Sequence, residues 1–414
     1  MKKQPKRFDM YRKPNKPRWY LKLVEYIAGP IYMWLFGGHV KVEKEVRKLK
    51  GPYLVLSTHA SFMDFPMLVK GLMPRTTGWV MSVEEFRRGD WLMYGIGGMP
   101  KRKFTHDIVT AKHMLRYLKK QNHSVTLYPE ARFELAGINE RLDGALGKFC
   151  KHAKVPVVMC MANGNFLNSP QWCKRPYKKI RQEAHIYQLL SVEDLERLSA
   201  DEIQAVIEKA FEKDEYAWQV EKGYHIKCKT RAEGLHRILY KCPACGAEFK
   251  TKTQGCRLWC DECGATWEMD TLSRLKGVNT EAGFSHVPDW YRWEREEVRK
   301  EVQAGKYHFE DDVKVVDYYS TKVGFVDVGE AHVVHDENGF TFKGVVNGKP
   351  FELNKPLSSM YSVHIEYDFL NKGDAFDIAT EQTTYFMYLK TAENYLTKMH
   401  FAQEELHDFY AKAK

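Results

Sequence analysis

The sequence has little that would cross a membrane, although 44% of its 414 residues are hydrophobic. The longest uncharged stretch near the N-terminus, residues 26–38, contains Pro30, and it is shorter than the run of about 20 apolar residues that a spanning helix needs. Mean hydropathy is −0.52 and 29% of residues are charged. These values exclude a polytopic membrane protein.

Cysteine is also scarce, with nine in the whole chain, four of them in two C-x-x-C pairs. This is too few and too uneven for a secreted disulfide scaffold, and a reducing compartment fits better. No A-x-A-like cleavage site follows Gly38, so we do not expect the basic and apolar start to be an export signal.

The N-terminus pairs a basic arm with an aromatic segment. Residues 1–18 hold eight Lys and Arg against one Asp, and residues 19–38 are rich in aromatic and aliphatic side chains. This order predicts an interfacial helix on an anionic lipid surface, at the cytoplasmic face of a membrane, peripheral or monotopic. A core helix preceded by a solvated tail remains the alternative.

Charge is divided unevenly along the chain. Residues 1–270 hold 47 Lys and Arg against 30 Asp and Glu, whereas residues 271–414 hold 17 against 24. The positive half favours anionic partners such as lipid headgroups, phosphorylated metabolites, coenzyme A or nucleic acid. Two regions with different partners are therefore expected.

Strand-length apolar runs alternate with helical patterns between residues 53 and 162. Strands are predicted at 53–57, 78–81, 124–128 and 155–162, and a helix at 105–121 with Thr105 as N-cap. The alternation predicts an α/β sheet whose site lies at the carboxyl ends of the strands.

The second half predicts different architecture. Helices are expected at 192–221, 288–305 and 391–412, a cysteine-bearing insert at 241–270, and β-structure over 307–389 with hairpin turns at Asn338-Gly339 and Asn347-Gly348. We divide the chain into 1–40 (arm and interfacial helix), 41–235 (catalytic domain), 236–275 (cysteine insert) and 276–414 (helix plus a mainly-β domain closed by a helix).

His59 and Asp64 form an H-x4-D pair just after the first buried strand. An imidazole there can act as a general base on a substrate hydroxyl, with the carboxylate fixing its tautomer and stabilising the imidazolium. No G-x-S-x-G occurs to supply a serine nucleophile. From these two residues alone, the favoured interpretation is that Asp64 caps a helix and His59 is a loop residue.

Two further blocks follow in order: Leu127-Tyr128-Pro129-Glu130-Ala131-Arg132-Phe133 after the third strand, and Val155-Pro156-Val157-Val158 in the fourth. With the His59–Asp64 block and residues 98–103, the set resembles the phospholipid and glycerol acyltransferase superfamily over about residues 20–220. The resemblance implies a glycerol-phosphate-acyltransferase-like mixed sheet flanked by helices.

The resemblance also implies roles. His59 would be the catalytic base and Asp64 its partner, while Glu130 and Arg132 would bind the acceptor. Arg102, or Lys103 in its place, would hold a phosphate. The acceptor would be a lysophosphatidate, another lysophospholipid or a related glycerol phosphate, and the donor a thioester of coenzyme A or of acyl carrier protein.

The third block departs from the family pattern. Arg132 comes two residues after Glu130 instead of three, and Ala131 replaces the usual glycine. This leaves acceptor identity open, and it leaves open a catalytically idle lipid- or protein-binding scaffold on the same fold. Without the resemblance, Arg132 would be read as one half of a surface ion pair.

The two C-x-x-C-G knuckles, at Cys242/Cys245 and Cys260/Cys263, predict a zinc ribbon. Four thiolates close a tetrahedral site with no open position, so the zinc would be structural. Cys256 lacks the knuckle glycine and is expected to be a free thiol. A second hypothesis is nucleic-acid binding by Lys250, Lys252 and Arg257 beside Phe249 and Trp259, but we expect nucleic acid to be an unlikely partner.

Overall fold

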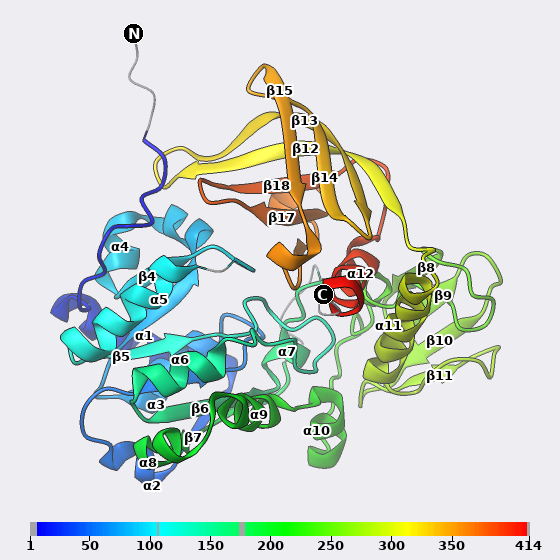
Figure 1. Cartoon of the computed structure of the whole chain (residues 1–414). Helices are drawn as coiled ribbons and strands as arrows, with labels where there is room; N and C mark the ends of the chain where they lie inside the picture. Colours follow the sequence, from blue (N-terminus) through cyan, green and yellow to red (C-terminus); the bar gives the residue numbers. More distant parts are fainter. Residues whose placement is uncertain (1–5, 106, 174–178, 412–414) are drawn as a thin grey trace.

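The computed structural model describes residues 6–105, 107–173 and 179–411. Lys2 and Lys3 of the basic arm, and Lys412 at the predicted end of the last helix, lie outside these ranges. Three sheets organise these described ranges. Figure 1 shows the first sheet and its helices at the lower left, the cysteine insert at the right and the C-terminal sheet at the top.

The first sheet is mixed and has the order β1-β7-β6-β2-β5-β3-β4. Neighbouring strands are parallel except β6 and β7, which are antiparallel. The central strand β2 is buried along its whole length, as its apolar sequence requires. The strands are β1 (Gly38–Val42), β2 (Leu54–Ser57), β3 (Thr77–Ser82), β4 (Gly98–Lys101), β5 (Ser124–Leu127), β6 (Val157–Asn163) and β7 (Gln182–Leu190).

Helices flank this sheet, as the alternation of patterns predicted. The predicted start of one of them was wrong: α5 begins at Ile108, and Asp107 caps it by accepting a hydrogen bond from the Thr110 N–H. The helices are α2 (Lys44–Lys48), α3 (Asp64–Leu72), α4 (Asp90–Gly95), α5 (Ile108–Leu115), α6 (Leu146–Ala153), α7 (Asn165–Asn168), α8 (Val192–Arg197), α9 (Ala200–Phe211) and α10 (Glu215–Lys222).

Helix α1 (Trp19–Phe36) packs one narrow stripe onto α3 and leaves apolar side chains outside. The stripe repeats every four residues, from Leu21 to Met33, and Gly29 brings the two helices close because a Cβ there would meet Val69 at 3.2 Å. Large apolar side chains that remain exposed include Trp19, Leu23, Val24, Ile27, Ile31, Trp34 and Leu35. No helix in the described ranges has the length and apolar content to span a membrane.

The cysteine insert is a small antiparallel sheet in the order β11-β10-β9-β8. Its strands are β8 (Thr251–Gln254), β9 (Arg257–Cys260), β10 (Thr266–Met269) and β11 (Leu275–Gly277). Helix α11 (Val287–Gln303) follows it and packs against the last helix of the chain.

The C-terminal domain is a seven-stranded antiparallel sheet in the order β15-β14-β13-β12-β18-β17-β16, followed by α12 (Leu396–Leu406). The two predicted hairpin turns join β13 to β14 and β14 to β15. The strands are β12 (Phe309–Ser320), β13 (Gly324–Asp336), β14 (Gly339–Val346), β15 (Lys349–Lys355), β16 (His364–Glu366), β17 (Ala375–Ala379) and β18 (Thr384–Leu389). Figure 1 places α12 at the centre of the molecule.

Candidate active site

The candidate active site lies where β2 ends and α3 begins. Three backbone and side-chain donors converge on one oxygen of Asp64: His59 Nδ1 at 3.0 Å, the Ala60 N–H at 2.8 Å and the Ser61 N–H at 3.0 Å. The carboxylate is buried, whereas the His59 side chain is 25% exposed. The two residues predicted from their spacing are therefore in direct contact.

The same geometry orients the imidazole. A carboxylate at Nδ1 places the proton on that nitrogen and leaves the lone pair on Nε2. Within the described residues, Nε2 makes no hydrogen bond. His59 thus presents an unoccupied base to the solvent side, with a negative charge behind it to stabilise the protonated ring.

Aromatic rings flank His59. Tyr128 stacks on the imidazole at 4.0 Å between ring centroids, and Phe133 lies at 4.3 Å. Both come from the third block of the resemblance, which follows β5, the strand paired with β2. Two aromatic side chains of this block thus lie against the imidazole ring.

Asn165 is a functional residue that the sequence analysis missed. Its Nδ2 donates to the second oxygen of Asp64 at 2.5 Å, and the residue is fully buried. The missed signal was its position: Asn165 follows β6, the other neighbour of β2, so it reaches the same sheet edge as His59.

Glu130 is buried behind His59. Its carboxylate accepts the His59 N–H at 3.2 Å and the Glu140 N–H at 2.8 Å. Burial raises the pKa of Glu130 to about 8, although the Glu140 N–H and Lys213 oppose the shift. Glu130 has no exposed surface, and its two hydrogen bonds tie the histidine loop, residues 58–64, to the backbone at Glu140.

The loop has a second buried support. The Glu134 N–H donates to the His59 carbonyl at 2.9 Å, and the Glu134 carboxylate pairs with Lys213 at 2.6 Å. Lys213 also binds Glu215 at 3.0 Å and the Ala162 carbonyl at 2.9 Å. Neither Lys213 nor Glu134 belongs to a block of the resemblance, and no motif in the sequence singles them out.

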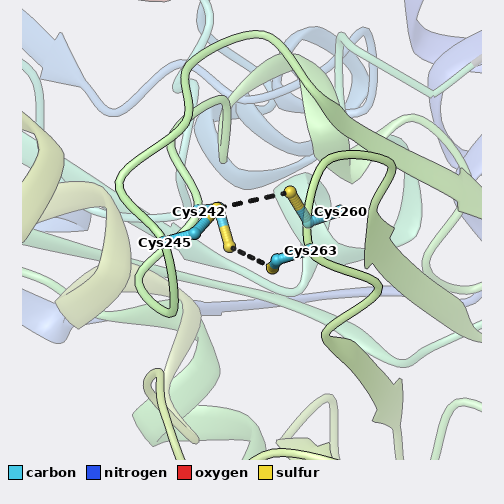
Figure 2. Close-up of side chains that lie close together, drawn as sticks. All are labelled: Cys242, Cys245, Cys260 and Cys263. Carbon is cyan, nitrogen blue, oxygen red and sulfur yellow. Dashed lines mark hydrogen bonds between the residues drawn. The ribbon is translucent and has the colours of Figure 1, made fainter.

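The four predicted zinc ligands come together. The Sγ atoms of Cys242, Cys245, Cys260 and Cys263 all lie within 4.8 Å of one another, with separations of 3.7 Å for Cys242–Cys263 and 3.9 Å for Cys245–Cys260 (Figure 2). A tetrahedral zinc with Zn–S bonds of about 2.3 Å gives edges of about 3.8 Å. The donor set fits a structural zinc, with two thiols buried and two exposed.

The two knuckles repeat the same turn. Gly246 and Gly264 both have a positive φ, 77° and 74°, and each N–H donates to the carbonyl of the first cysteine of its pair. Glycine adopts this conformation without strain. Cys256 is outside the group of four, and its Sγ lies 3.2 Å from the Lys229 carbonyl.

The two aromatic residues named for base stacking, Phe249 and Trp259, both contact other residues of the protein. Phe249 stacks on Tyr240 at 5.3 Å and packs against Tyr395 at 5.1 Å. Trp259 donates its Nε1–H to Asp261. Phe249 therefore serves the interface between the insert and the C-terminal domain.

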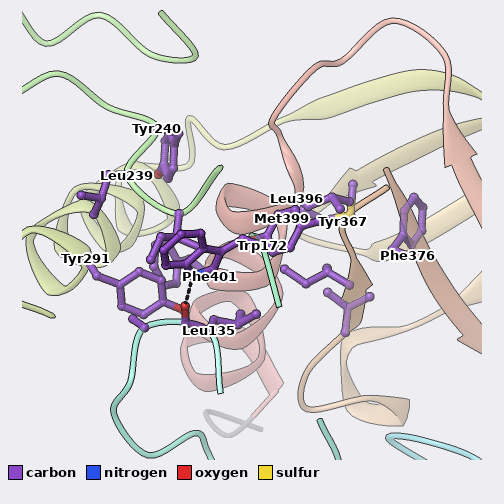
Figure 3. Packing of buried hydrophobic residues seen from close by; sticks show 14 of the residues in the cluster. Leu135, Trp172, Leu239, Tyr240, Tyr291, Tyr367, Phe376, Leu396, Met399 and Phe401 are labelled. Carbon is purple, nitrogen blue, oxygen red and sulfur yellow. Dashed lines mark hydrogen bonds between the residues drawn. The ribbon is translucent and has the colours of Figure 1, made fainter. Parts of the chain in front are cut away.

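That interface centres on α12, every residue of which is buried. Figure 3 shows side chains from distant parts of the chain around it, including Leu135 and Trp172 of the catalytic domain, Tyr291 of α11 and Phe376 of β17. All belong to one continuous apolar cluster. The catalytic domain, the insert and the C-terminal domain therefore share a core.

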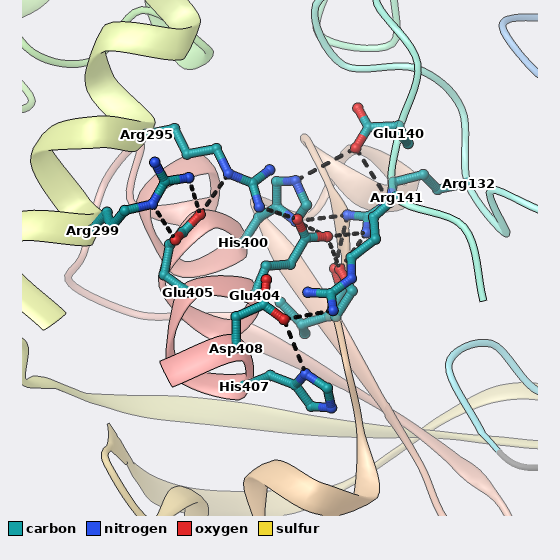
Figure 4. A network of polar contacts seen from close by, with 12 residues as sticks. Arg132, Glu140, Arg141, Arg295, Arg299, His400, Glu404, Glu405, His407 and Asp408 are labelled. Atoms are coloured by element: carbon teal, nitrogen blue, oxygen red, sulfur yellow. Dashed lines mark hydrogen bonds and ion pairs between the residues drawn. The ribbon is translucent and has the colours of Figure 1, made fainter. Parts of the chain in front are cut away.

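The three cations predicted to bind the acceptor face this C-terminal domain. Arg102 donates to the carbonyls of Glu381 and Gln382, both at 2.9 Å. Lys103 lies 3.3 Å from the Asp377 carboxylate. Arg132 joins a network with residues of α12 (Figure 4). His59 and Asp64 therefore lie together as predicted. The three cations instead contact residues of the C-terminal domain.

Comparisons with known proteins give little further information. No family model matches the chain, and no curated protein matches its sequence. Among solved structures, the chain is similar to the 1-acyl-sn-glycerophosphate (LPA) acyltransferase PlsC from Thermotoga maritima, with 18% identity and a TM-score of 0.38, over 46% of this chain and 77% of that one. A likeness of this strength says nothing about the site or the reaction.

Proposed function

We propose that the protein is an O-acyltransferase that moves a fatty acyl group from a thioester donor to a substrate hydroxyl, with His59 as general base. The observation that carries the proposal is the His59 ring itself, oriented by Asp64 through Nδ1 at 3.0 Å and open at Nε2. This arrangement suits removal of a proton from a bound hydroxyl.

The reaction needs no covalent acyl-enzyme. Nε2 takes the hydroxyl proton as the hydroxyl oxygen attacks the thioester carbonyl carbon. The tetrahedral intermediate then expels the thiolate, which receives the proton from the imidazolium, and the products are an ester and a free thiol. Asp64 stabilises the imidazolium during this sequence, and Asn165 holds the second oxygen of Asp64 in place.

The substrates implied by the resemblance define the first assays. Donors are acyl-CoA or acyl carrier protein thioesters, and the acceptors to begin with are lysophosphatidate and related glycerol phosphates. Support for an amphiphilic acceptor comes from Phe62 of the histidine loop, which is 55% exposed. Its ring packs against Tyr32 of α1, with 5.4 Å between the ring centroids. The exposed apolar face of α1 thus continues up to the loop that carries the base.

A membrane surface is proposed as the place of action, at the cytoplasmic face and in a peripheral or monotopic mode. Support comes from α1, where Trp34 is 81% exposed and Ile27 63%. Lys13 and Lys16 of the preceding arm are exposed, whereas Arg7 pairs with Asp317 at 3.0 Å. Part of the arm is therefore available to anionic lipid.

Membrane binding is tested by co-sedimentation with vesicles of anionic phospholipid. A Trp34→Ser, Ile27→Ser double variant should lose most of the bound fraction, because both side chains leave the apolar face that would enter the interface. The control is Val345→Ser, which removes a comparably exposed apolar side chain from β14. Equal binding by all three proteins would refute the membrane proposal.

The reaction is tested by thiol release from a panel of acyl thioesters with hydroxyl acceptors. His59→Ala should lower kcat by roughly 10²–10⁴-fold, the usual contribution of a general base. The matched control is His332→Ala, an exposed histidine on β13. Comparable thiol release by wild type and His59→Ala would refute the base, and acceptor-dependent release by none of the proteins would favour the idle scaffold.

A further inference from the structure

The cations that the resemblance assigns to an acceptor phosphate have other partners in this chain. Arg102 is 9% exposed, and its two terminal nitrogens donate to consecutive carbonyls, those of Glu381 and Gln382, in the turn between β17 and β18. The planar fork that suits a phosphate is thus filled by backbone oxygens.

Lys103 is neutralised by a carboxylate. Its Nζ lies 3.3 Å from Asp377 on β17 and 3.2 Å from His364 on β16, and Glu366 lies at 4.0 Å. Asp377 is 3% exposed. A buried ammonium that already has a buried carboxylate leaves no net charge for an incoming anion.

Arg132 is the most enclosed of the three, with 1% of its side chain exposed. It donates to the Val363 carbonyl at 3.1 Å and to Ser362 Oγ, and its guanidinium lies 3.2 Å from Glu404 of α12 and 2.8 Å from His400 Nδ1. Figure 4 shows this network closed by Glu140, Arg295 and further residues of α12. The guanidinium is thus enclosed by protein, and among the described residues only its Nε has no hydrogen-bond partner.

These contacts belong to a permanent interface. The C-terminal domain is not a lid, because α12 is buried along its whole length in a cluster that includes Leu135 and Trp172 of the catalytic domain. Moving the domain away would expose that cluster and separate three buried charged groups from their partners at once. Lids that open during turnover have few such buried contacts.

We propose that the acceptor of this enzyme carries no phosphomonoester, and that Arg102, Lys103 and Arg132 hold the C-terminal domain in place. The inference rests on the proposed acyltransferase function and narrows its substrate class to amphiphiles that have a free hydroxyl and no terminal phosphate. The surroundings of His59 agree with such an acceptor, because Tyr128 and Phe133 flank the ring and exposed Phe62 links the loop to α1.

The test compares two acceptors that differ only in the phosphate: 1-monoacylglycerol and 1-acylglycerol 3-phosphate with the same acyl chain, in neutral micelles with an acyl-CoA donor. We expect kcat/KM for the monoacylglycerol to equal or exceed that for the phosphate. A preference for the phosphate acceptor of roughly 100-fold or more, the size that recognition of a buried polar group gives, would overturn the inference.

Lys103→Gln in the full chain provides a second arm. We expect a lower melting temperature and an unchanged ratio of kcat/KM between the two acceptors, with Lys343→Gln, an exposed lysine on β14, as control. A selective loss of the phosphate acceptor in Lys103→Gln would overturn the inference while leaving the acyltransferase proposal intact. Turnover of neither acceptor above the His59→Ala level would instead overturn both.

Discussion

His59 and Arg132 follow neighbouring strands of one sheet, yet they are held in opposite ways. The hydrogen bonds that shape the histidine loop come from the loop itself, as between His59 and Asp64, and from other residues of the same domain, such as Asn165. The hydrogen-bond partners of Arg132 lie 230 to 272 positions away, on the C-terminal domain. In our proposal the loop serves the chemistry and the arginine serves assembly, so variants in the two regions should affect different measurements.

The largest loss of stability should follow the removal of a zinc ligand. Cys260→Ser removes a buried ligand from an insert that shares its core with α12. Because zinc sites supply roughly 10–16 kcal/mol in isolated fingers, we expect the insert to unfold and the melting transition to broaden or split. Calorimetry with and without a chelator measures this.

Cys256→Ser is the matched control for the zinc ligand, because Cys256 lies in the same insert but outside the four. It should melt like wild type and bind one zinc per chain. A chelator-insensitive wild type with no bound zinc would contradict the assignment of the metal site.

Arg132→Met should be next in size. Breaking a buried ion pair from one side costs about 3–5 kcal/mol, and Glu404 would be left facing an apolar side chain. Arg141→Met is the control, since its pair with Asp408 is partly exposed and should contribute less than about 1 kcal/mol. Equilibrium denaturation of both variants gives the comparison, and equal losses of stability would contradict it.

On the chemistry side, Asn165→Leu removes the donor to the second oxygen of Asp64. An unsatisfied buried acceptor costs about 1–3 kcal/mol, so we expect kcat to fall roughly tenfold or more. KM for the thioester donor should stay the same, because Asn165 acts only through Asp64. A higher KM with unchanged kcat would place Asn165 in substrate binding instead.

Lowering the pH should destabilise the C-terminal domain through His335. This histidine is fully buried on β13 between Tyr307 and Gln403, and burial lowers its pKa to about 3. Between that value and its unfolded value near 6.5, only the unfolded chain binds the proton, so stability falls as pH drops, by about 1.4 kcal/mol per unit for one group. Denaturation midpoints of wild type and His335→Gln from pH 7 to 5 should diverge, with the variant less sensitive.

The smallest change in unfolding free energy should come from replacing Ala131, whose φ is 58°. A Cβ in the left-handed region costs about 1–2 kcal/mol, and glycine loses part of that gain through its greater unfolded-state freedom. Ala131→Gly should therefore raise the unfolding free energy by less than about 1 kcal/mol. A destabilised variant would show that the alanine methyl packs productively there.

The local part of this molecule was predictable and the long-range part was not. The four main strands of the first sheet, the hairpin turns and the cysteine knuckles each carry their signal within a few residues. His59 and Asp64 were found because a strand end and a five-residue spacing place them together. The partners of Arg102 and Arg132 depend on how the C-terminal domain docks, and no local pattern near those residues contains that information.

The strands that the sequence analysis missed have the same explanation. β1 and β4 are short edge strands of the first sheet, and β7 mixes polar and apolar residues. Their pairing comes from neighbours already in the sheet, with β7 running against β6. Propensity alone is a weak guide where tertiary contacts decide the strand.

The position of α12 in the chain has a consequence during synthesis. Arg132 is made long before residues 396–406, and at about 5–20 residues per second the roughly 260 residues between them take about 13–50 s to translate. During that interval the nascent catalytic domain carries unneutralised cations and an open apolar face. The shared apolar core can therefore form only after α12 has been synthesised. A chain whose translation stalls before α12 would need chaperones to prevent aggregation.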